Sequence, residues 1–183
     1  MRIWTEIAYC RDQSNKDLGF YYNEIKNKYK SKEYKNDWIC LLDHDARFLI
    51  DSWYTIMEKH ILESGNEYKL FSCLTNRVAN KQQCVQSMWA EDRNSEHKKY
   101  AESIKQNHKL LEMPKSKPIS GVLLLFPAQI PVKFREGGKC LGVDNNFHYD
   151  IIDAGFKAGL MMDLYVYHWY RFDTSPTNIN HLQ

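Results

Sequence analysis

An apolar run that stops at two acids is the feature that most constrains the fold of this chain. Residues 38–42, WICLL, carry no charge, and Asp43, His44 and Asp45 follow directly. Such a run predicts a strand covered on both faces in the middle of a sheet. A buried carboxylate without a partner is costly or shifts its pKa to escape ionisation. The sequence therefore predicts a cation beside the end of this strand.

Strand and helix patterns alternate along the rest of the chain. Apolar, β-branched and aromatic residues predict strands at 2–10, 37–42, 68–74, 119–127 and 160–169. Apolar residues at helical spacing predict helices at 20–35, 48–64, 97–111 and 146–154. Gly65 and Gly155 stand where the second and fourth of these helices would end. The alternation predicts an α/β fold, a single-domain Rossmann-like α/β/α sandwich around a central mixed sheet.

The length and charge of the chain limit the classes of protein to consider. A length of 183 residues fits one domain. We expect residues 1–173 to form it, with a mobile loop and helix region at 75–117 and a tail at 174–183. A net charge of +2 predicts no nucleic-acid binding. The longest apolar stretch, residues 121–132, is too short to span a bilayer, so no transmembrane segment is expected.

The cysteines and the first residues bear on the compartment. The chain has 5 cysteines, an odd number, and none of them has CxxC spacing. This pattern indicates neither a zinc site nor a disulfide framework. The N-terminal residues lack the apolar core of a signal peptide. We therefore expect a soluble, cytoplasmic protein in a reducing compartment.

Side chains that suit a metal and a diphosphate lie at the ends of two predicted strands. Asp43 and Asp45 share one face of an extended chain, because side chains alternate with a period of two. Paired carboxylates suit Mg²⁺ or Mn²⁺. The last strand brings His168, an acceptable ligand for Mn²⁺, and Arg171, a phosphate-binding residue. His44 should point to the opposite face and is not assigned to the metal.

Each of these residues also has a purely structural interpretation. Asp45 would serve equally as the N-cap of a helix that begins near Phe48. His168 stands among aromatic residues, where a core histidine bonded to the backbone is common. Trp169 is similarly typical of core and rim packing. Trp89 differs, because it lies in the polar region 75–117 and is placed to stack on an acceptor sugar or cover a donor.

Four stretches, in order, resemble nucleotide-sugar-dependent glycosyltransferases with the A-type (GT-A) fold, a group similar to the large inverting family 2. The stretches are Asn15–Glu24 (NKDLGFYYNE), Asp37–Phe48 (DWICLLDHDARF), Ile119–Phe126 (ISGVLLLF) and Gly142–Phe156 (GVDNNFHYDIIDAGF). The last is followed by a strand that leads to VYHW, and the match covers most of residues 15–172. The resemblance implies a metal-assisted transfer of a sugar from a nucleotide donor, a UDP-sugar by family habit, to a glycan or other hydroxyl acceptor.

The resemblance also assigns roles in the reaction. It makes Asp45 the direct carboxylate ligand of Mn²⁺ or Mg²⁺, and His168 the last protein ligand. Asp43 would touch the metal through water or hold the ribose of the donor. Asp144 matches the general base of inverting members, which deprotonates the acceptor hydroxyl. The metal would stabilise the charge on the departing nucleoside diphosphate.

Further residues fall on the donor and acceptor sides. Compared with the family, the chain passes from one strand and one helix directly to Asp37 and is therefore short at its N-terminus. The resemblance then assigns nucleobase binding to the end of the first strand and to the loop that follows it. The residues assigned to donor binding are Ala8, Tyr9, Arg11, Asn15, Gly19, Asn23, Asp43, His44 and Arg171. The residues assigned to the acceptor side are Gly121, Trp89 and Trp169. A partner domain or an oligomer would complete acceptor recognition.

The departures from the family pattern leave alternatives open. Val143 and Asn146 stand where the family has a glutamate and a second aspartate, which leaves a retaining mechanism open and allows Asp144 to be a helix N-cap. A non-catalytic domain that binds sugar nucleotide or glycan is a second hypothesis, which these two residues favour. A phosphohydrolase of the haloacid dehalogenase type is a third, for which Arg47 fits poorly.

Overall fold

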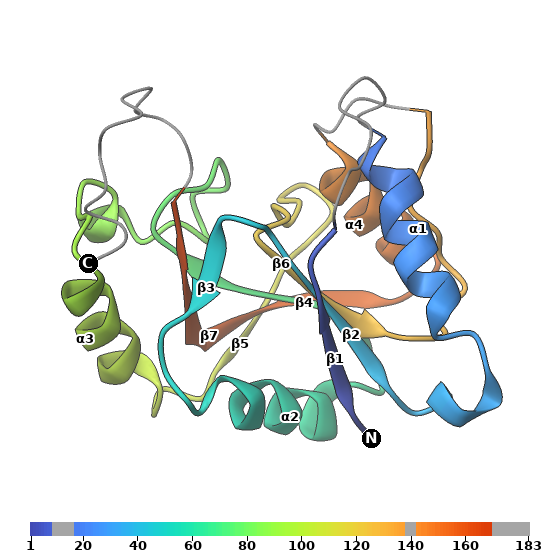
Figure 1. The fold of residues 1–183 in the computed structure, drawn as a ribbon, viewed down its shortest axis with the longest axis horizontal. Coiled ribbons are helices and arrows are strands. Elements are labelled where there is room, and N and C mark those ends of the chain that lie inside the picture. Colours follow the sequence, from blue (N-terminus) through green and yellow to red (C-terminus); the bar gives the residue numbers. More distant parts are fainter. Residues whose placement is uncertain (9–16, 138–141, 170–183) are drawn as a thin grey trace.

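The structure, a computed structural model, describes residues 1–8, 17–137 and 142–169 (Figure 1). These residues form one α/β domain with a seven-stranded sheet. The helices are α1 (Leu18–Lys28), α2 (Trp53–Ser64), α3 (Asn94–Ile104) and α4 (Val143–Asp153), with short 3-10 turns at Lys32–Tyr34 and Gln86–Met88. The strands are β1 (Ile3–Glu6), β2 (Trp38–Leu42), β3 (Ala46–Phe48), β4 (Tyr68–Thr75), β5 (Leu110–Glu112), β6 (Leu123–Pro127) and β7 (Lys157–His168).

The sheet is mixed, as the sequence predicts. Its order is β1-β2-β6-β4-β7-β3, and β5 also pairs with β7. β1 is parallel to β2, and β4 is parallel to β7. β6 lies between β2 and β4 and is antiparallel to both. Strands β1, β2, β4 and β7 therefore run in one direction, and their carboxyl ends meet at one edge of the sheet.

Helices cover both faces of the sheet. Phe71 of β4 pairs with Leu125 of β6, so the next residue, Phe126, points to the opposite face. On the Phe71 face, the ring of His60 from α2 lies 6.5 Å from the Phe71 ring. On the other face, Phe147 of α4 lies 5.2 Å from Phe126. Figure 1 shows α1 beside α4. These layers confirm the predicted α/β sandwich.

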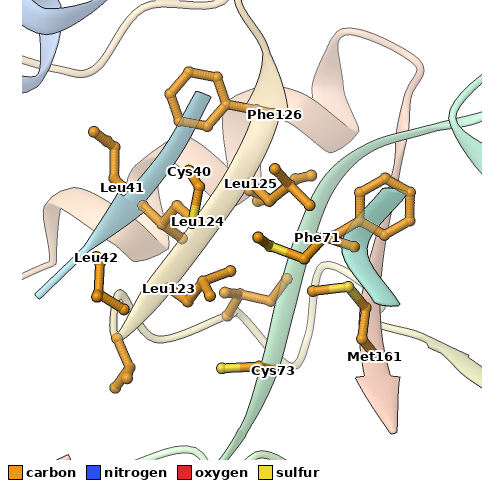
Figure 2. Packing of buried hydrophobic residues seen from close by; sticks show 14 of the residues in the cluster. Cys40, Leu41, Leu42, Phe71, Cys73, Leu123, Leu124, Leu125, Phe126 and Met161 are labelled. Atoms are coloured by element: carbon orange, nitrogen blue, oxygen red, sulfur yellow. The ribbon is translucent and has the colours of Figure 1, made fainter. Parts of the chain in front are cut away.

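The core lies where β2, β6 and β4 meet. All residues of β2 and the first four of β6 are buried. Figure 2 shows the side chains of residues 40–42 and 123–126 packed with Phe71 and Cys73 of β4. Full burial of one such aliphatic or aromatic side chain contributes about 1.5–3 kcal/mol. The apolar run at residues 38–42 is therefore a central strand, and Asp43 follows its last residue at the edge of the sheet.

Several predicted boundaries were wrong. The first helix ends at Lys28 rather than at residue 35, because Tyr29 is its C-cap and Lys32–Tyr34 form a separate 3-10 turn. The second begins at Trp53 rather than at residue 48, because residues 46–48 pair with β7. Residues 110 and 111, predicted as the end of a helix, belong to β5 instead.

The two predicted helix ends are confirmed. Gly65 is the C-cap of α2, and its N–H donates to the Ile61 carbonyl at 2.8 Å. Gly155 follows α4 with a φ of 85°, the left-handed conformation that favours glycine. The described cysteines, Cys40, Cys73 and Cys84, are buried free thiols. Among the described helices, none is long and apolar enough to cross a membrane.

Candidate metal centre

A tight turn after β2 places two carboxylates beside the end of β7. The Asp43 N–H donates to the Val122 carbonyl at 3.1 Å, which extends the pairing of β2 with β6. The Asp43 carbonyl then accepts from the N–H of Ala46 at 3.1 Å, and the chain turns into β3. In β3, Ala46 pairs with His168. The backbone therefore holds the Asp43–Asp45 turn against the last residue of β7.

The three residues predicted to bind a metal come together in this turn. Nε2 of His168 lies 3.2 Å from Oδ1 of Asp45 and 3.8 Å from Oδ2 of Asp43. The candidate ligand atoms of the three side chains all lie within 4.8 Å of one another. His168 is buried, while both aspartates are partly exposed. The side chains thus form a cluster of two carboxylates and one imidazole that solvent reaches from one side.

The end of β4 fixes the orientation of the His168 ring. Nδ1 of His168 lies 2.6 Å from the carbonyl oxygen of Arg77, and the backbone N–H of His168 donates to Oδ1 of Asn76 at 2.8 Å. A carbonyl oxygen only accepts, so Nδ1 carries the proton and Nε2 faces the two carboxylates. A metal-binding histidine is held in this way, with its other ring nitrogen donating to a carbonyl or carboxylate.

The electrostatics of the cluster favour a bound cation. Burial raises the pKa of Asp43 to about 6; the charges of Asp45 and Asp144 add to this, and His168 opposes it. Burial lowers the pKa of His168, but the hydrogen bond and charge of Asp45 outweigh burial and leave the pKa raised. Because both pKa values are raised, Asp43 and His168 keep their protons to a higher pH than usual. A divalent cation would replace these protons and balance the carboxylate charge.

A third carboxylate, that of Asp144, lies in the first turn of α4. Its Oδ2 accepts from the Gly121 N–H at 2.7 Å, and its Oδ1 accepts from the Asn145 N–H at 2.8 Å. Burial raises its pKa, and its charge reaches Asp43. Gly142, not Asp144, is the N-cap of α4, so the N-cap interpretation of Asp144 was wrong.

The N-cap interpretation of Asp45 was also wrong. The N-cap of α2 is Ser52, and strand β3 lies between Asp45 and that helix. The carbonyl oxygen of Asp45 accepts instead from the Trp169 N–H at 2.9 Å. The backbone of Asp45 thus joins the turn to the end of β7, and its carboxylate faces His168.

Gly121 holds Asp144 by a close backbone approach. A Cβ at Gly121 would lie 3.1 Å from Cβ of Asp144 and 3.3 Å from its Oδ2, tighter than ordinary packing allows. A cavity of about 480 Å³ lies near this contact. Ser120 and Asn145, the chain neighbours of Gly121 and Asp144, line it together with Ala79, Asn80, Lys81, Gln82, Lys117 and Pro118.

Gly19 and Asn23, predicted to bind a donor, lie where α1 docks on the segment before residue 137. A Cβ at Gly19 would lie 2.1 Å from the Arg135 carbonyl oxygen, so this approach requires glycine. The Asn23 side chain donates to the Phe134 carbonyl at 2.8 Å and accepts from the Phe134 N–H at 3.0 Å. This contact accounts for both residues without a ligand.

The remaining predicted residues lie at several places. Ala8 follows β1 and packs against the core. His44 is exposed in the turn between Asp43 and Asp45. Trp89 is half-buried against the core, and its carbonyl accepts from Nε of Arg77 at 2.8 Å. Tyr9, Arg11, Asn15 and Arg171 lie outside the described residues.

Two residues that support the cluster were missed from the sequence. Asn76 and Arg77 follow β4, and they bond to the backbone and ring of His168. The available signal was their position, because the carboxyl end of β4 meets the same edge as those of β2 and β7. That signal requires the strand order, which local patterns do not provide.

No family model, no curated protein and no solved structure matches this chain.

Proposed function

We propose that this protein is a metal-dependent glycosyltransferase with the A-type fold. It would use Mn²⁺ or Mg²⁺ to transfer a sugar from a nucleotide-sugar donor to a hydroxyl acceptor, and a UDP-sugar is the favoured donor. The convergence of Asp43, Asp45 and His168 within 4.8 Å carries this proposal. Asp144, whose charge acts on Asp43, adds a base at the same edge of the sheet. The resemblance of the four sequence segments supports the choice of reaction.

The donor set fits the cation that such a reaction uses. Two carboxylates are hard ligands suited to Mg²⁺ or Mn²⁺, and the imidazole of His168 favours Mn²⁺. Nε2 of His168 is available to a cation because Nδ1 is bonded to the Arg77 carbonyl. When bound, the cation supplies charge stabilisation for a departing diphosphate. The protein residues supply its position at the open edge of the sheet.

Asp144 is suited to remove a proton from the acceptor. Its raised pKa makes the carboxylate a stronger base than an exposed aspartate. The N–H groups of Gly121 and Asn145 fix the positions of its two oxygens. The 480 Å³ cavity beside Ser120 and Asn145 gives room for a sugar ring. These features support a direct displacement with Asp144 as base.

A non-catalytic binding domain is the second candidate, and one observation favours it. Val143, which stands where the resembling family has a glutamate, is only 3% exposed and packs in the core. The position is therefore built for packing rather than for an acid. Such a domain would bind the same donor and cation through Asp43, Asp45 and His168 without turnover.

A donor screen separates these candidates. With Mn²⁺ present, we expect a UDP-sugar to raise the melting temperature, since it binds only the folded state. Asp45→Asn should abolish the shift, and Asp51→Asn, the same change at an exposed aspartate, should retain it. If neither UDP-sugars nor GDP-sugars move the melting curve, the proposed function is rejected.

Product analysis then tests turnover. Wild-type protein with the donor found by the screen should form nucleoside diphosphate and a glycosylated acceptor. Asp144→Asn should still bind the donor but form no product. A wild-type protein that binds the donor without forming product would be the binding domain instead. Turnover of a generic phosphate ester would identify a phosphohydrolase.

A further inference from the structure

A second cluster of ionisable side chains lies away from the candidate metal centre, between α2, β7 and the segment before β5. Nε2 of His60 lies 2.6 Å from Oδ1 of Asp163, and Nδ1 of His108 lies 2.7 Å from Oδ2 of the same carboxylate. His60 and Asp163 are each 1% exposed, and His108 is partly exposed. The candidate ligand atoms of the three residues lie within 4.8 Å of one another.

An irregularity in β7 coincides with Asp163. The adjacent residues Cys73 and Leu74 of β4 pair with Met161 and Tyr165 of β7, so β7 contains extra residues at this point, Asp163 among them. Bulges of this kind re-aim a side chain and are common next to functional sites. The pairing of β7 with β4 is thus irregular where this buried carboxylate contacts two imidazoles.

Both imidazoles are oriented for a common ligand. His60 lies on α2 one turn before Glu63, on the same side of the helix. Oε2 of Glu63 lies 2.8 Å from Nε2 of His108, which leaves Nδ1 of His108 directed at Asp163. A carboxylate bonded to the far nitrogen of a histidine is the usual support of a metal-binding imidazole.

The charges of the cluster also suit a divalent cation. The rings of His60 and His108 lie 4.2 Å apart, so protonating both would place two positive charges almost in contact. Asp163 contacts both rings and Glu63 contacts His108, so two carboxylates are present to balance the charge of a divalent cation. A divalent cation would bind both rings in their neutral form and the carboxylate together. It would join α2, β7 and the segment before β5.

We propose that His60, His108 and Asp163 form a second metal site, which takes Zn²⁺ or a similar transition-metal ion. Two imidazole nitrogens and one carboxylate are a ligand set suited to Zn²⁺, and they leave a fourth position open. His108 and Asp163 border a cavity of about 290 Å³, which gives access for a water or small anion as fourth ligand. Lys59 and Lys105 line the same cavity and favour an anion. This site is independent of the proposed glycosyl transfer.

The test removes the first metal centre and measures zinc on the second. Untagged Asp43→Asn/Asp45→Asn protein is incubated with ZnCl₂, desalted and analysed for zinc by mass spectrometry. We expect about one equivalent of zinc per chain. Zinc-free protein after this treatment would overturn the proposal, and this result requires no change within the second cluster.

Added substitutions locate the bound ion. In the same double-variant background, His108→Gln should abolish zinc retention, whereas His44→Gln, at an exposed histidine, should leave it unchanged. Glu63→Gln, at an exposed residue that supports His108, should lower the zinc affinity about 10-fold. Co²⁺ should give a visible absorption spectrum that disappears with His108→Gln. Full zinc retention by His108→Gln, or an unchanged affinity in Glu63→Gln, would contradict the assignment.

Discussion

The His168 ring connects the end of β4 to the turn after β2. Its Nδ1 lies 2.6 Å from the carbonyl oxygen of Arg77, and its Nε2 lies 3.2 Å from Oδ1 of Asp45. One nitrogen therefore holds the ring in place, and the other is presented to the carboxylates. The two functions of the ring are separable by substitution, because each depends on a different atom.

Asn and Ala at position 168 should separate these functions. His168→Asn places an amide N–H near the Nδ1 position and retains a donor for the Arg77 carbonyl, but it lacks Nε2. We expect His168→Asn to be about 1 kcal/mol more stable than His168→Ala in urea unfolding. Both variants should bind Mn²⁺ at least about 10-fold more weakly than wild type in titration calorimetry. Wild-type affinity in either variant would show that His168 is not a ligand.

The effect of Mn²⁺ on stability should increase with pH. The pKa of Asp43 is about 6 in the folded protein against an ordinary value of 3.8, so the cation-free protein loses stability as the pH rises through this interval. The raised pKa of His168 acts in the same direction, with stability lost as the pH rises through its folded pKa. The lowered pKa of Asp45 has its effect below that interval.

Mn²⁺ competes with the protons that Asp43 and His168 retain, so its effect on the melting temperature should depend on pH. We expect the rise in melting temperature caused by Mn²⁺ to be small near about pH 5 and to grow toward about pH 7.5. Asp43→Asn should flatten this dependence. A Mn²⁺ effect that is equal at all these pH values in wild-type protein would contradict the account.

Asn76 should matter for both stability and metal binding. Asn76 is fully buried, and its Oδ1 accepts from the backbone N–H of His168 at 2.8 Å. Asn76→Ala leaves that buried N–H unpaired, so we expect the free energy of unfolding to fall by about 1–3 kcal/mol. Mn²⁺ affinity should fall about 10-fold, because the support of a ligand is lost. Asn27→Ala, at an exposed asparagine of α1, is the control and should change neither quantity.

A methyl group at position 121 should impair turnover without weakening the binding of the donor. The added Cβ would press on Asp144 at 3.1 Å and displace its carboxylate. We expect Gly121→Ala to lower kcat about 10-fold or more, because a displacement of 1 Å costs about 10²-fold. Donor binding with Mn²⁺, followed by thermal shift, should stay at the wild-type level. An unchanged kcat would mean that the position of Asp144 does not limit the reaction.

The fold was predictable where a local pattern had one structural meaning. The five apolar residues of β2 predicted a central strand, and Gly65 and Gly155 predicted two helix ends. Strand β3 was missed because three residues form it only by pairing with β7, more than a hundred residues later. The helical spacing of Ile50, Trp53 and Tyr54 added to the error, because the predicted helix was extended back to Phe48, whose ring in fact stacks on Trp53 at 4.2 Å.

The site was predictable to a similar degree. Asp43 and Asp45 follow from the end of β2, and His168 from the end of β7, because carboxyl ends of parallel strands share an edge. Asn76 and Arg77 required the position of β4 in the sheet. The second cluster had no sequence signal, because it joins residues of α2, β7 and the segment before β5 that are far apart in the chain.

The most direct test of the central claim is pulsed electron paramagnetic resonance of Mn²⁺ bound to the protein in the presence of UDP. A His108→Gln background removes any contribution from the second cluster. The account predicts nitrogen-14 coupling from His168 that disappears in His168→Ala, and phosphorus-31 coupling from the diphosphate. Nitrogen coupling that persists in His168→Ala, or Mn²⁺ without phosphorus coupling, would contradict it.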